Sequence, residues 1–259
     1  MKILFPLKAG ILLLEKMKII SYILSTLFAI VFFIILLVFH PIQWIGLKLG
    51  GQELHQKVVN VMNWFLVKSL LILGVPVRVE NKYDIPKNQT VIFVSNHQSM
   101  FDIPPIIWYF RKHCPKFVSK IELGKGIPSI SFNLKHGGAA LIDRKDKKQA
   151  IAEMINFSKR INEKKWSATI FPEGTRSRNG QPKSFASNGL KMLVKYNPDT
   201  YVVPLSINNS WKVFKYGKFP LGVGSPIKIT THEPIKVDSL PFEELLQKVE
   251  ATVKSGIQQ

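Results

Sequence analysis

Residues 90–102 read Thr-Val-Ile-Phe-Val-Ser-Asn-His-Gln-Ser-Met-Phe-Asp, and this stretch is the best guide to the fold class. Its first half, 90–95, is a short run rich in β-branched and aromatic residues, which predicts a buried strand. Its second half turns polar, so that His97 and Asp102 follow the strand directly. In open α/β sheets, functional side chains lie just beyond the carboxyl ends of strands. The stretch therefore predicts such a strand with a polar site at its end.

The rest of the chain after residue 76 alternates between strand and helix patterns. Further strands are expected at 139–142, 167–171, 201–207 and 226–230, and helices at 147–165, 189–196 and 240–255. The helix 147–165 should bury one face, which comprises Ile151, Met154, Ile155, Ser158 and Ile161. Pro204 should place its strand at an edge or a bulge. This alternation predicts an α/β fold, with a largely parallel mixed sheet flanked by helices.

A membrane-embedded helical segment is expected at the N-terminus. Residues 19–39 are uncharged and would form a helix about 30 Å long, the thickness of a hydrocarbon core. A cleaved signal peptide fits less well, because the apolar run is too long and no A-x-A-like site follows. Residues 58–75 are amphipathic, with one polar and one apolar face: Asn60, Asn63 and Lys68 on the first, and Val61, Phe65, Leu66 and Leu70 on the second. They predict either a helix in the membrane interface or a core helix.

The charge indicates an anionic membrane surface as the partner. The formal charge is +19, of which residues 1–75 carry a net +5 and residues 76–259 a net +14. Nucleic acid and anionic bilayers are the common partners of such a basic protein, and the apolar segment favours the bilayer over nucleic acid. Basic residues flank the apolar run on both sides, which predicts a helical hairpin that enters one leaflet and returns. The expected division is 1–75 for the membrane segment and 76–259 for the α/β domain.

His97 and Asp102 could form a general base and its partner. Histidine is the natural base near neutral pH. A carboxylate five residues later can fold back to one imidazole nitrogen and leave the other free to take a proton. The nucleophile that would complete a triad is missing, and a substrate hydroxyl could supply it. Alone, the pair is also compatible with a loop histidine that has no catalytic role.

Residues 171–177, Phe-Pro-Glu-Gly-Thr-Arg-Ser, also follow an expected strand and could cradle a phosphate. An arginine fork pairs with two phosphate oxygens, and the neighbouring hydroxyls could add hydrogen bonds. A polar turn with a solvated Arg176 is the other interpretation. Arg144 is a second candidate for the phosphate, with Asp143 beside it to hold it. Lys120 is a weaker one.

Four blocks taken together resemble one family, the glycerolipid acyltransferases, and within it the 1-acyl-sn-glycerol-3-phosphate acyltransferases. The blocks are 96–102, 138–144, 171–177 and 202–205, and the resemblance covers about 76–230. Two segments depart from the family pattern. Residues 139–141 are Ala-Ala-Leu where the family has a bulky or aromatic residue, and 127–132 are Ile-Pro-Ser-Ile-Ser-Phe, in a region expected to line the acyl tunnel.

The resemblance implies a direct acyl transfer. His97 would deprotonate the 2-hydroxyl of lysophosphatidic acid, and Asp102 would orient His97. The donor thioester would be acyl-CoA or acyl-carrier protein. The product would be phosphatidic acid, in phospholipid biosynthesis, and no further cofactor and no metal are expected. The residues implied at the acceptor phosphate are Glu173, Gly174, Thr175, Arg176, Arg144 and Lys120. A bacterial inner membrane, with the catalytic domain on the cytoplasmic side, is the expected location.

Other functions fit parts of the sequence. The same chemistry could act on glycerol-3-phosphate or on another lysophospholipid. A non-catalytic, membrane-anchored protein that binds anionic lipid would explain the charge but not the His97–Asp102 pair. A lipid hydrolase would need a distant serine, and the chain lacks a G-x-S-x-G elbow. The one cysteine, Cys114, excludes an intramolecular disulfide and a Cys-rich metal site.

Overall fold

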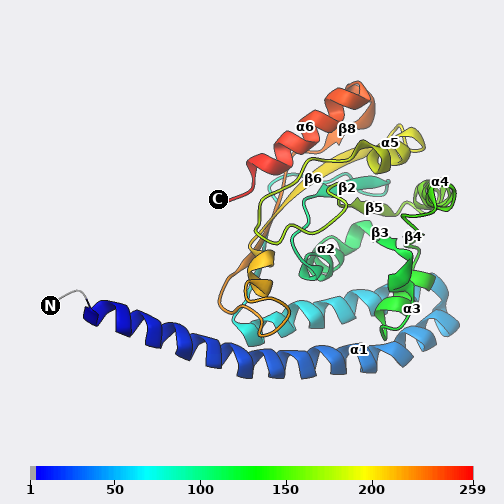
Figure 1. Ribbon diagram of the computed structural model, residues 1–259. Coiled ribbons are helices and arrows are strands. Elements are labelled where there is room, and N and C mark those ends of the chain that lie inside the picture. Colours follow the sequence, from blue (N-terminus) through cyan, green and yellow to red (C-terminus); the bar gives the residue numbers. More distant parts are fainter. Residues whose placement is uncertain (1–3, 259) are drawn as a thin grey trace.

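A computed structural model describes the backbone of residues 4–258 and the side chains of residues 18–258. It shows one mixed sheet with helices on both faces and a long bent helix across the lower side (Figure 1). The fold class is therefore as the sequence predicted.

The strands are β1 (Val77–Glu80), β2 (Val91–Ser95), β3 (Pro115–Lys120), β4 (Ala140–Ile142), β5 (Ser167–Ile170), β6 (Tyr201–Asn208), β7 (Ile227–Thr231) and β8 (Ile235–Lys236). The α-helices are α1 (Leu4–Ser69), α2 (Ile103–Tyr109), α3 (Ile130–His136), α4 (Lys147–Glu163), α5 (Ser187–Lys195) and α6 (Phe242–Ser255). Short 3-10 helices are η1 (Leu70–Leu73), η2 (Met100–Asp102), η3 (Arg111–His113), η4 (Ile121–Gly124), η5 (Ser210–Phe214) and η6 (Val237–Ser239).

The strand order is β1-β7-β6-β2-β5-β3-β4, and β8 pairs with β6. The neighbours β6, β2, β5, β3 and β4 are all parallel. Only the pairs of β6 with β7 and β8 are antiparallel. Because five parallel strands lie side by side, their carboxyl ends meet at one edge of the sheet, as the sequence argument for the site requires.

Both faces of the sheet are buried, so its strands alternate between two cores. On β2, Val91 and Phe93 pack toward α2 and the long helix α1. Ile92 and Val94 pack on the opposite face, with residues of α4, α5 and α6. This burial on both sides explains the continuous apolar run at 91–94.

Two expectations about single residues were wrong. Pro204 lies in a central strand, β6. It is accommodated because it falls between the β8 ladder, which ends at Val202, and the β7 ladder, which begins at Leu205. Ile151 is 53% exposed, because α4 turns its buried side at Met154, Phe157, Ser158 and Ile161 toward the sheet.

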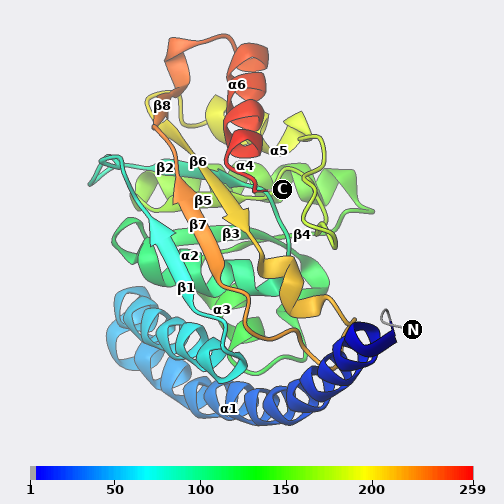
Figure 2. The ribbon, with the colours of Figure 1, turned by 90° about the vertical axis from the view of Figure 1, so that its left-hand side faces the viewer.

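The helix α1 is a hairpin with its turn at Gly50 and Gly51 (Figures 1 and 2). Gly51 has φ 60° and ψ −153°, a conformation that only glycine adopts readily. The two arms then run antiparallel. Phe39 packs on Phe65 with ring centroids 5.7 Å apart, and His55 lies 3.3 Å from the Gln43 side-chain oxygen.

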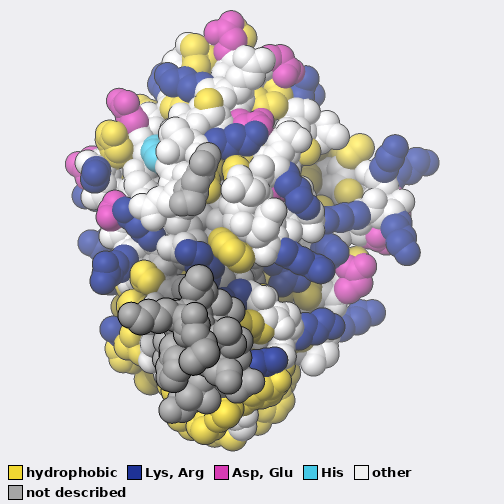
Figure 3. Space-filling model, turned by 60° about the vertical axis from the view of Figure 1, so that its left-hand side comes forward, with side chains coloured by type: hydrophobic (Ala, Val, Ile, Leu, Met, Phe, Trp, Pro, Cys, Tyr) yellow, Lys and Arg dark blue, Asp and Glu magenta, His cyan; other side chains and the backbone are white. Residues whose placement is uncertain are grey.

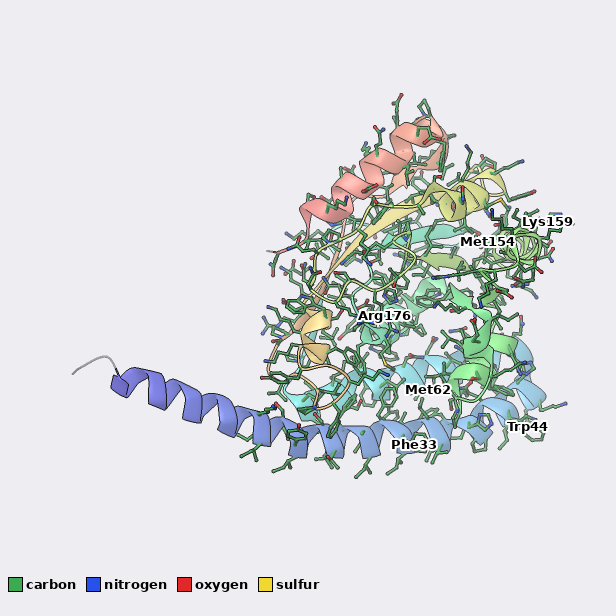
Figure 4. All side chains as sticks on the ribbon, in the orientation of Figure 1. Phe33, Trp44, Met62, Met154, Lys159 and Arg176 are labelled. Atoms are coloured by element: carbon green, nitrogen blue, oxygen red, sulfur yellow. The ribbon has the colours of Figure 1, made fainter. Side chains whose placement is uncertain are left out.

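The first arm lies lengthwise along the body. Its inner face is buried at Ser25, Phe28, Leu36 and Gln43, while large apolar side chains remain exposed on the outer face. Figure 4 shows Phe33 and Trp44 on that outer face, pointing away from the body. Among the described residues, Lys18–Leu73 is the one helix long and apolar enough to cross a membrane, and it is consistent with membrane association.

The second arm is largely a core helix, one of the two alternatives for this stretch. Met62, Leu66 and Leu70 are buried between the first arm and the body. The expected division of its faces was right for Leu66 and Leu70, which are buried, and wrong for three others, because Asn63 is buried while Val61 and Phe65 are exposed. The Asn63 amide is accommodated by donating to the backbone oxygen of Val59, one turn earlier.

Candidate active site

The sheet topology brings the polar residues of the sequence blocks to one edge. His97 follows β2, Gly174 follows β5, and Arg144 follows β4. Lys120 is the last residue of β3. Because these strands are parallel neighbours, the four positions share the carboxyl edge of the sheet.

His97 and Asp102 form a hydrogen-bonded pair. His97 Nδ1 lies 2.8 Å from Asp102 Oδ2, and the Asp102 side chain is fully buried. A carboxylate can only accept, so Nδ1 carries the proton and donates it. The lone pair of His97 Nε2 is then free to act as a base.

The carboxylate of Asp102 is held by three further donors. Its Oδ2 accepts from the backbone N–H groups of Gln98, at 2.7 Å, and Ser99, at 2.9 Å. Its Oδ1 accepts from the hydroxyl of Ser210 in η5. Ser99 also caps η2 by accepting from the N–H of Phe101. This network fixes the carboxylate and thereby the plane of the imidazole.

The His97 ring is also fixed from its flat side. It stacks on Phe171, with centroids 4.1 Å apart and planes 15° from parallel. The His97 side chain is 17% exposed. Among the described residues no serine hydroxyl bonds to this imidazole, and the Ser210 hydroxyl lies behind it on the carboxylate. The arrangement therefore leaves Nε2 of His97 open to a hydrogen-bonding group from outside the chain.

Glu173 holds backbone rather than facing outward. Its Oε1 accepts from the N–H of His97 at 2.9 Å, and its Oε2 accepts from the N–H of Lys183 at 3.1 Å. Burial raises the pKa of the Glu173 carboxyl, and the two N–H donors oppose that rise. With both oxygens engaged and a charge that repels phosphate, Glu173 fits a positioning function better than the phosphate contact expected from the resemblance.

Three residues of the 171–177 block are open to solvent, whereas its Ser177 is buried. Gly174, Thr175 and Arg176 are exposed at the end of β5, and Figure 4 shows Arg176 between the level of the sheet and that of the hairpin. Arg144 is exposed and donates to the backbone oxygen of Gly174, which joins the β4 and β5 loops. Asp143 does not pair with Arg144, since its carboxylate accepts from the N–H of Lys145.

Aromatic rings connect the site to the hairpin. Phe101, next to Asp102, packs against Phe28 and Phe32 of α1 at 5.6 and 6.2 Å. Phe214, which ends the η5 helix that begins at Ser210, stacks on Phe101 at 5.5 Å. We call these four rings the aromatic floor of the site.

Comparisons with known proteins agree with this geometry. A family model described as Acyltransferase matches residues 76–208, just over half of the chain. The chain belongs to the acyltransferase family. The matched range contains the His97–Asp102 pair and the Arg144 and Arg176 loops of this acyltransferase.

Individual relatives carry one activity in their names. A 1-acyl-sn-glycerol-3-phosphate acyltransferase of Borreliella burgdorferi is 27% identical over 196 residues, covering 72% of this chain and 76% of the relative. The human 1-acyl-sn-glycerol-3-phosphate acyltransferase beta is 24% identical over 230 residues, covering 82% and 81%. The crystal structure of the 1-acyl-sn-glycerophosphate (LPA) acyltransferase PlsC from Thermotoga maritima matches with a TM-score of 0.78 and 26% identity, over 93% of this chain and 96% of that one.

Sequence reasoning missed the partners that hold this acyltransferase's site together. Ser210 and Gln98 bond to each other as well as to Asp102, since Ser210 N donates to Gln98 Oε1 at 3.1 Å. Asn96 bonds to both backbone groups of Ile207 in β6. No spacing rule links Ser210 to a motif 108 residues earlier. Ser210 comes close to Asp102 because β6, the strand before Ser210, pairs with β2, the strand before His97.

Proposed function

We propose that this protein transfers a fatty acyl chain from a thioester to the 2-hydroxyl of lysophosphatidic acid, giving phosphatidic acid in phospholipid biosynthesis. The observation that carries the proposal is the buried His97–Asp102 pair beside an exposed, arginine-bearing loop at the carboxyl edge of the sheet. The names of the relatives support the acceptor.

In the proposed mechanism, His97 Nε2 removes the proton from the acceptor 2-hydroxyl as its oxygen attacks the thioester carbonyl. The carboxylate of Asp102 stabilises the imidazolium that forms, since it lies 2.8 Å from Nδ1. The oxygen–carbonyl bond forms as the carbon–sulfur bond breaks. The thiolate takes a proton, and His97 is the nearest source. No acyl-enzyme is required.

The proposed acceptor-phosphate site consists of Gly174, Thr175 and Arg176, with Arg144 and Lys120 as further cations. Arg144 already contacts this loop by donating to the Gly174 oxygen, so the loops after β4 and β5, the two strands that flank β3, each contribute a guanidinium group. Arginine binds phosphate oxygens through two parallel N–H groups. Glu173 would fix the loop to the His97 backbone and so set the distance between phosphate and base.

The hairpin is proposed to lie in one leaflet, with its exposed apolar face toward the acyl chains. Its outer face is apolar at Ile23, Ile30, Phe33, Ile34 and Leu37, and its inner face is covered by the body. Figure 3 shows many Lys and Arg side chains on the body above an apolar lower surface. This arrangement puts basic groups at the headgroup level of an anionic membrane, such as the cytoplasmic side of a bacterial inner membrane. Protease accessibility of both flanks in sealed vesicles would test it, and flanks on opposite sides would refute it.

The activity is tested by acyl transfer from labelled acyl-CoA and acyl-carrier protein, with lysophosphatidate, glycerol-3-phosphate and other lysophospholipids as acceptors. The expected result is transfer to lysophosphatidate and a loss of about 10²-fold or more in kcat for His97→Ala, with the fold retained. Arg176→Ala should instead raise KM for the acceptor. Full activity in His97→Ala would refute the mechanism, and transfer only to another acceptor would refute the substrate.

A further inference from the structure

A cavity of about 290 Å³ lies between the hairpin and α3. Its wall comes from the hairpin, from the loop after η4 and from α3: His40, Gly124, Lys125, Gly126, Ser131, Phe132, Lys135 and His136. None of the residues proposed for catalysis or for the acceptor phosphate lines it. Ser131 and Phe132 belong to the segment expected to line the acyl tunnel, but the basic residues of the lining lie outside that segment and have no function in the proposed reaction.

The lining of this cavity suits an anion. Lys125 and Lys135 are exposed at its wall, and within residues 18–258 neither forms an ion pair with a carboxylate. No Asp or Glu lines the cavity. Two free ammonium groups around one concave surface provide six N–H donors, which is the chemistry that phosphate oxygens require.

His40 adds a donor whose tautomer is set by the backbone. Its Nδ1 accepts from the N–H of Ser129 at 3.0 Å, so in this arrangement the ring proton resides on Nε2. The ring is further held against Phe132, at 5.7 Å and nearly perpendicular. The His136 ring also contacts Phe132, with centroids 4.5 Å apart. Contacts within the protein therefore orient both imidazole rings before any ligand binds.

The backbone beside the cavity is strained and pinned to the hairpin. Ser129 has φ 60° and ψ −48°, and Ile130 N donates to Pro128 O at 2.6 Å, which defines a γ-turn of the rare, strained hand. The Ser129 hydroxyl donates to the Leu36 oxygen of α1 at 2.6 Å. Strain of this kind persists where the surrounding structure over-determines it, and it concentrates at binding sites. The two hydrogen bonds of Ser129 to α1 hold the loop that contains Lys125 in place relative to His40.

The cavity also lies at the right level for a lipid headgroup. The stretch of α1 that supplies His40 exposes Leu37, Val38 and Trp44 on its outer face. If that face lies among acyl chains, His40 and the lysines lie at the headgroup region. Basic pockets between helices at that level bind phosphate headgroups.

We propose that this cavity binds the phosphate group of an anionic phospholipid and so fixes the enzyme's depth and tilt on the membrane. The proposal is independent of the acyl-transfer chemistry and depends only on the hairpin lying in a leaflet. Inorganic phosphate offers the same oxygens, so the test separates the two sources.

The test titrates the full-length protein in neutral detergent with phosphatidylglycerol or phosphatidylcholine and measures the affinity of the first bound lipid by native mass spectrometry. Lys125→Ala/Lys135→Ala should weaken phosphatidylglycerol binding about 30-fold, since each lysine near an anionic lipid contributes about a factor of five. Lys125→Arg/Lys135→Arg should retain it. Binding of phosphatidylcholine should not change.

The matched control is Lys148→Ala/Lys159→Ala, which removes two exposed lysines of α4, and Figure 4 shows Lys159 on α4, away from the hairpin. Equal phosphatidylglycerol affinity in wild type and Lys125→Ala/Lys135→Ala, or an equal loss in the control, would overturn the proposal. A second arm adds inorganic phosphate, with chloride at equal ionic strength as its reference. Displacement of the lipid by phosphate means that the cavity also takes the free ion, and retention means that it takes phosphate only on a lipid. Both outcomes are consistent with phosphate binding.

Discussion

The substitution Asp102→Asn separates the charge of the carboxylate from its structural function. In the native site, Oδ2 accepts from His97 and from the N–H groups of Gln98 and Ser99, while Oδ1 accepts, among the residues that the structure describes, only from Ser210. An asparagine can place its oxygen at the Oδ2 position and its NH₂ toward Ser210, whose hydroxyl can turn to accept. The opposite orientation would set NH₂ against three N–H donors. The variant should therefore fold and keep the imidazole in place.

The expected loss in rate follows from the distance of the charge. A unit charge about 4 Å from the imidazolium contributes about 4 kcal/mol at an effective dielectric constant of about 20. Because the imidazolium is only partly formed in the transition state, about 2–4 kcal/mol should be lost, or roughly 30- to 1,000-fold in kcat. KM for either substrate should change little.

Steady-state acyl transfer and thermal unfolding, measured on the same preparation, check this prediction. Asp102→Ala is the comparison, because it removes all four contacts and leaves buried N–H groups unpaired, each at a cost of about 1–3 kcal/mol. It should lower Tm as well as kcat. If Asp102→Asn keeps its fold and its kcat within about threefold of wild type, the carboxylate charge has no part in the reaction.

Three further predictions concern single residues. Ser210→Ala should lower kcat about 3- to 10-fold with KM unchanged, because Asp102 Oδ1 loses its only donor; an unchanged kcat would remove Ser210 from the site. Burial lowers the pKa of His232, which contacts Ser206 at 2.7 Å, so the unfolded chain binds more protons and stability should fall as pH drops below about 6.5. The Tm of His232→Gln should fall less than that of wild type between pH 7.5 and 5, and parallel curves would contradict this. Gly51→Ala should cost about 1–3 kcal/mol in unfolding free energy, because its backbone conformation strains any other residue; Gly189→Ala, where a Cβ meets open space, is the control and should not destabilise.

Local sequence patterns predicted much of the fold. The five expected strands all exist, because each is a short apolar or β-branched run. The signal is plainest in β2 and β5, which are buried on both faces of the sheet. The strand β1 was not expected, since Val77–Glu80 alternates Val with Arg and Glu over only four residues. The prediction that Pro204 marks an edge or a bulge was wrong, because a local rule for proline does not take account of a gap between two antiparallel ladders on the same strand.

The candidate site was predicted where its residues are close in sequence and missed where they are not. His97 and Asp102 are five residues apart, so a single turn joins them. Ser210 is close to Asp102 because of strand pairing, which the sequence spacing does not show. The Glu173 carboxylate accepts a hydrogen bond from the His97 N–H instead of facing solvent, and this contact also joins residues far apart in the sequence. The amphipathic pattern of 58–75 could not show which face is buried, because two different partners, the first arm and the body, compete for it.

The aromatic floor has a consequence for protein engineering. Phe28 and Phe101 are 3% and 4% exposed, and each forms part of one core cluster with residues of the sheet. A shortened fragment that begins after the hairpin, made for easier purification or for inhibitor screening, would lose Phe28 and Phe32 and uncover Phe101 beside Asp102. Compounds selected against such a fragment would meet an exposed Phe101 next to Asp102, a surface that the hairpin covers in the full-length protein. Solubility is better sought by changing the outward-facing apolar residues of the hairpin than by removing it.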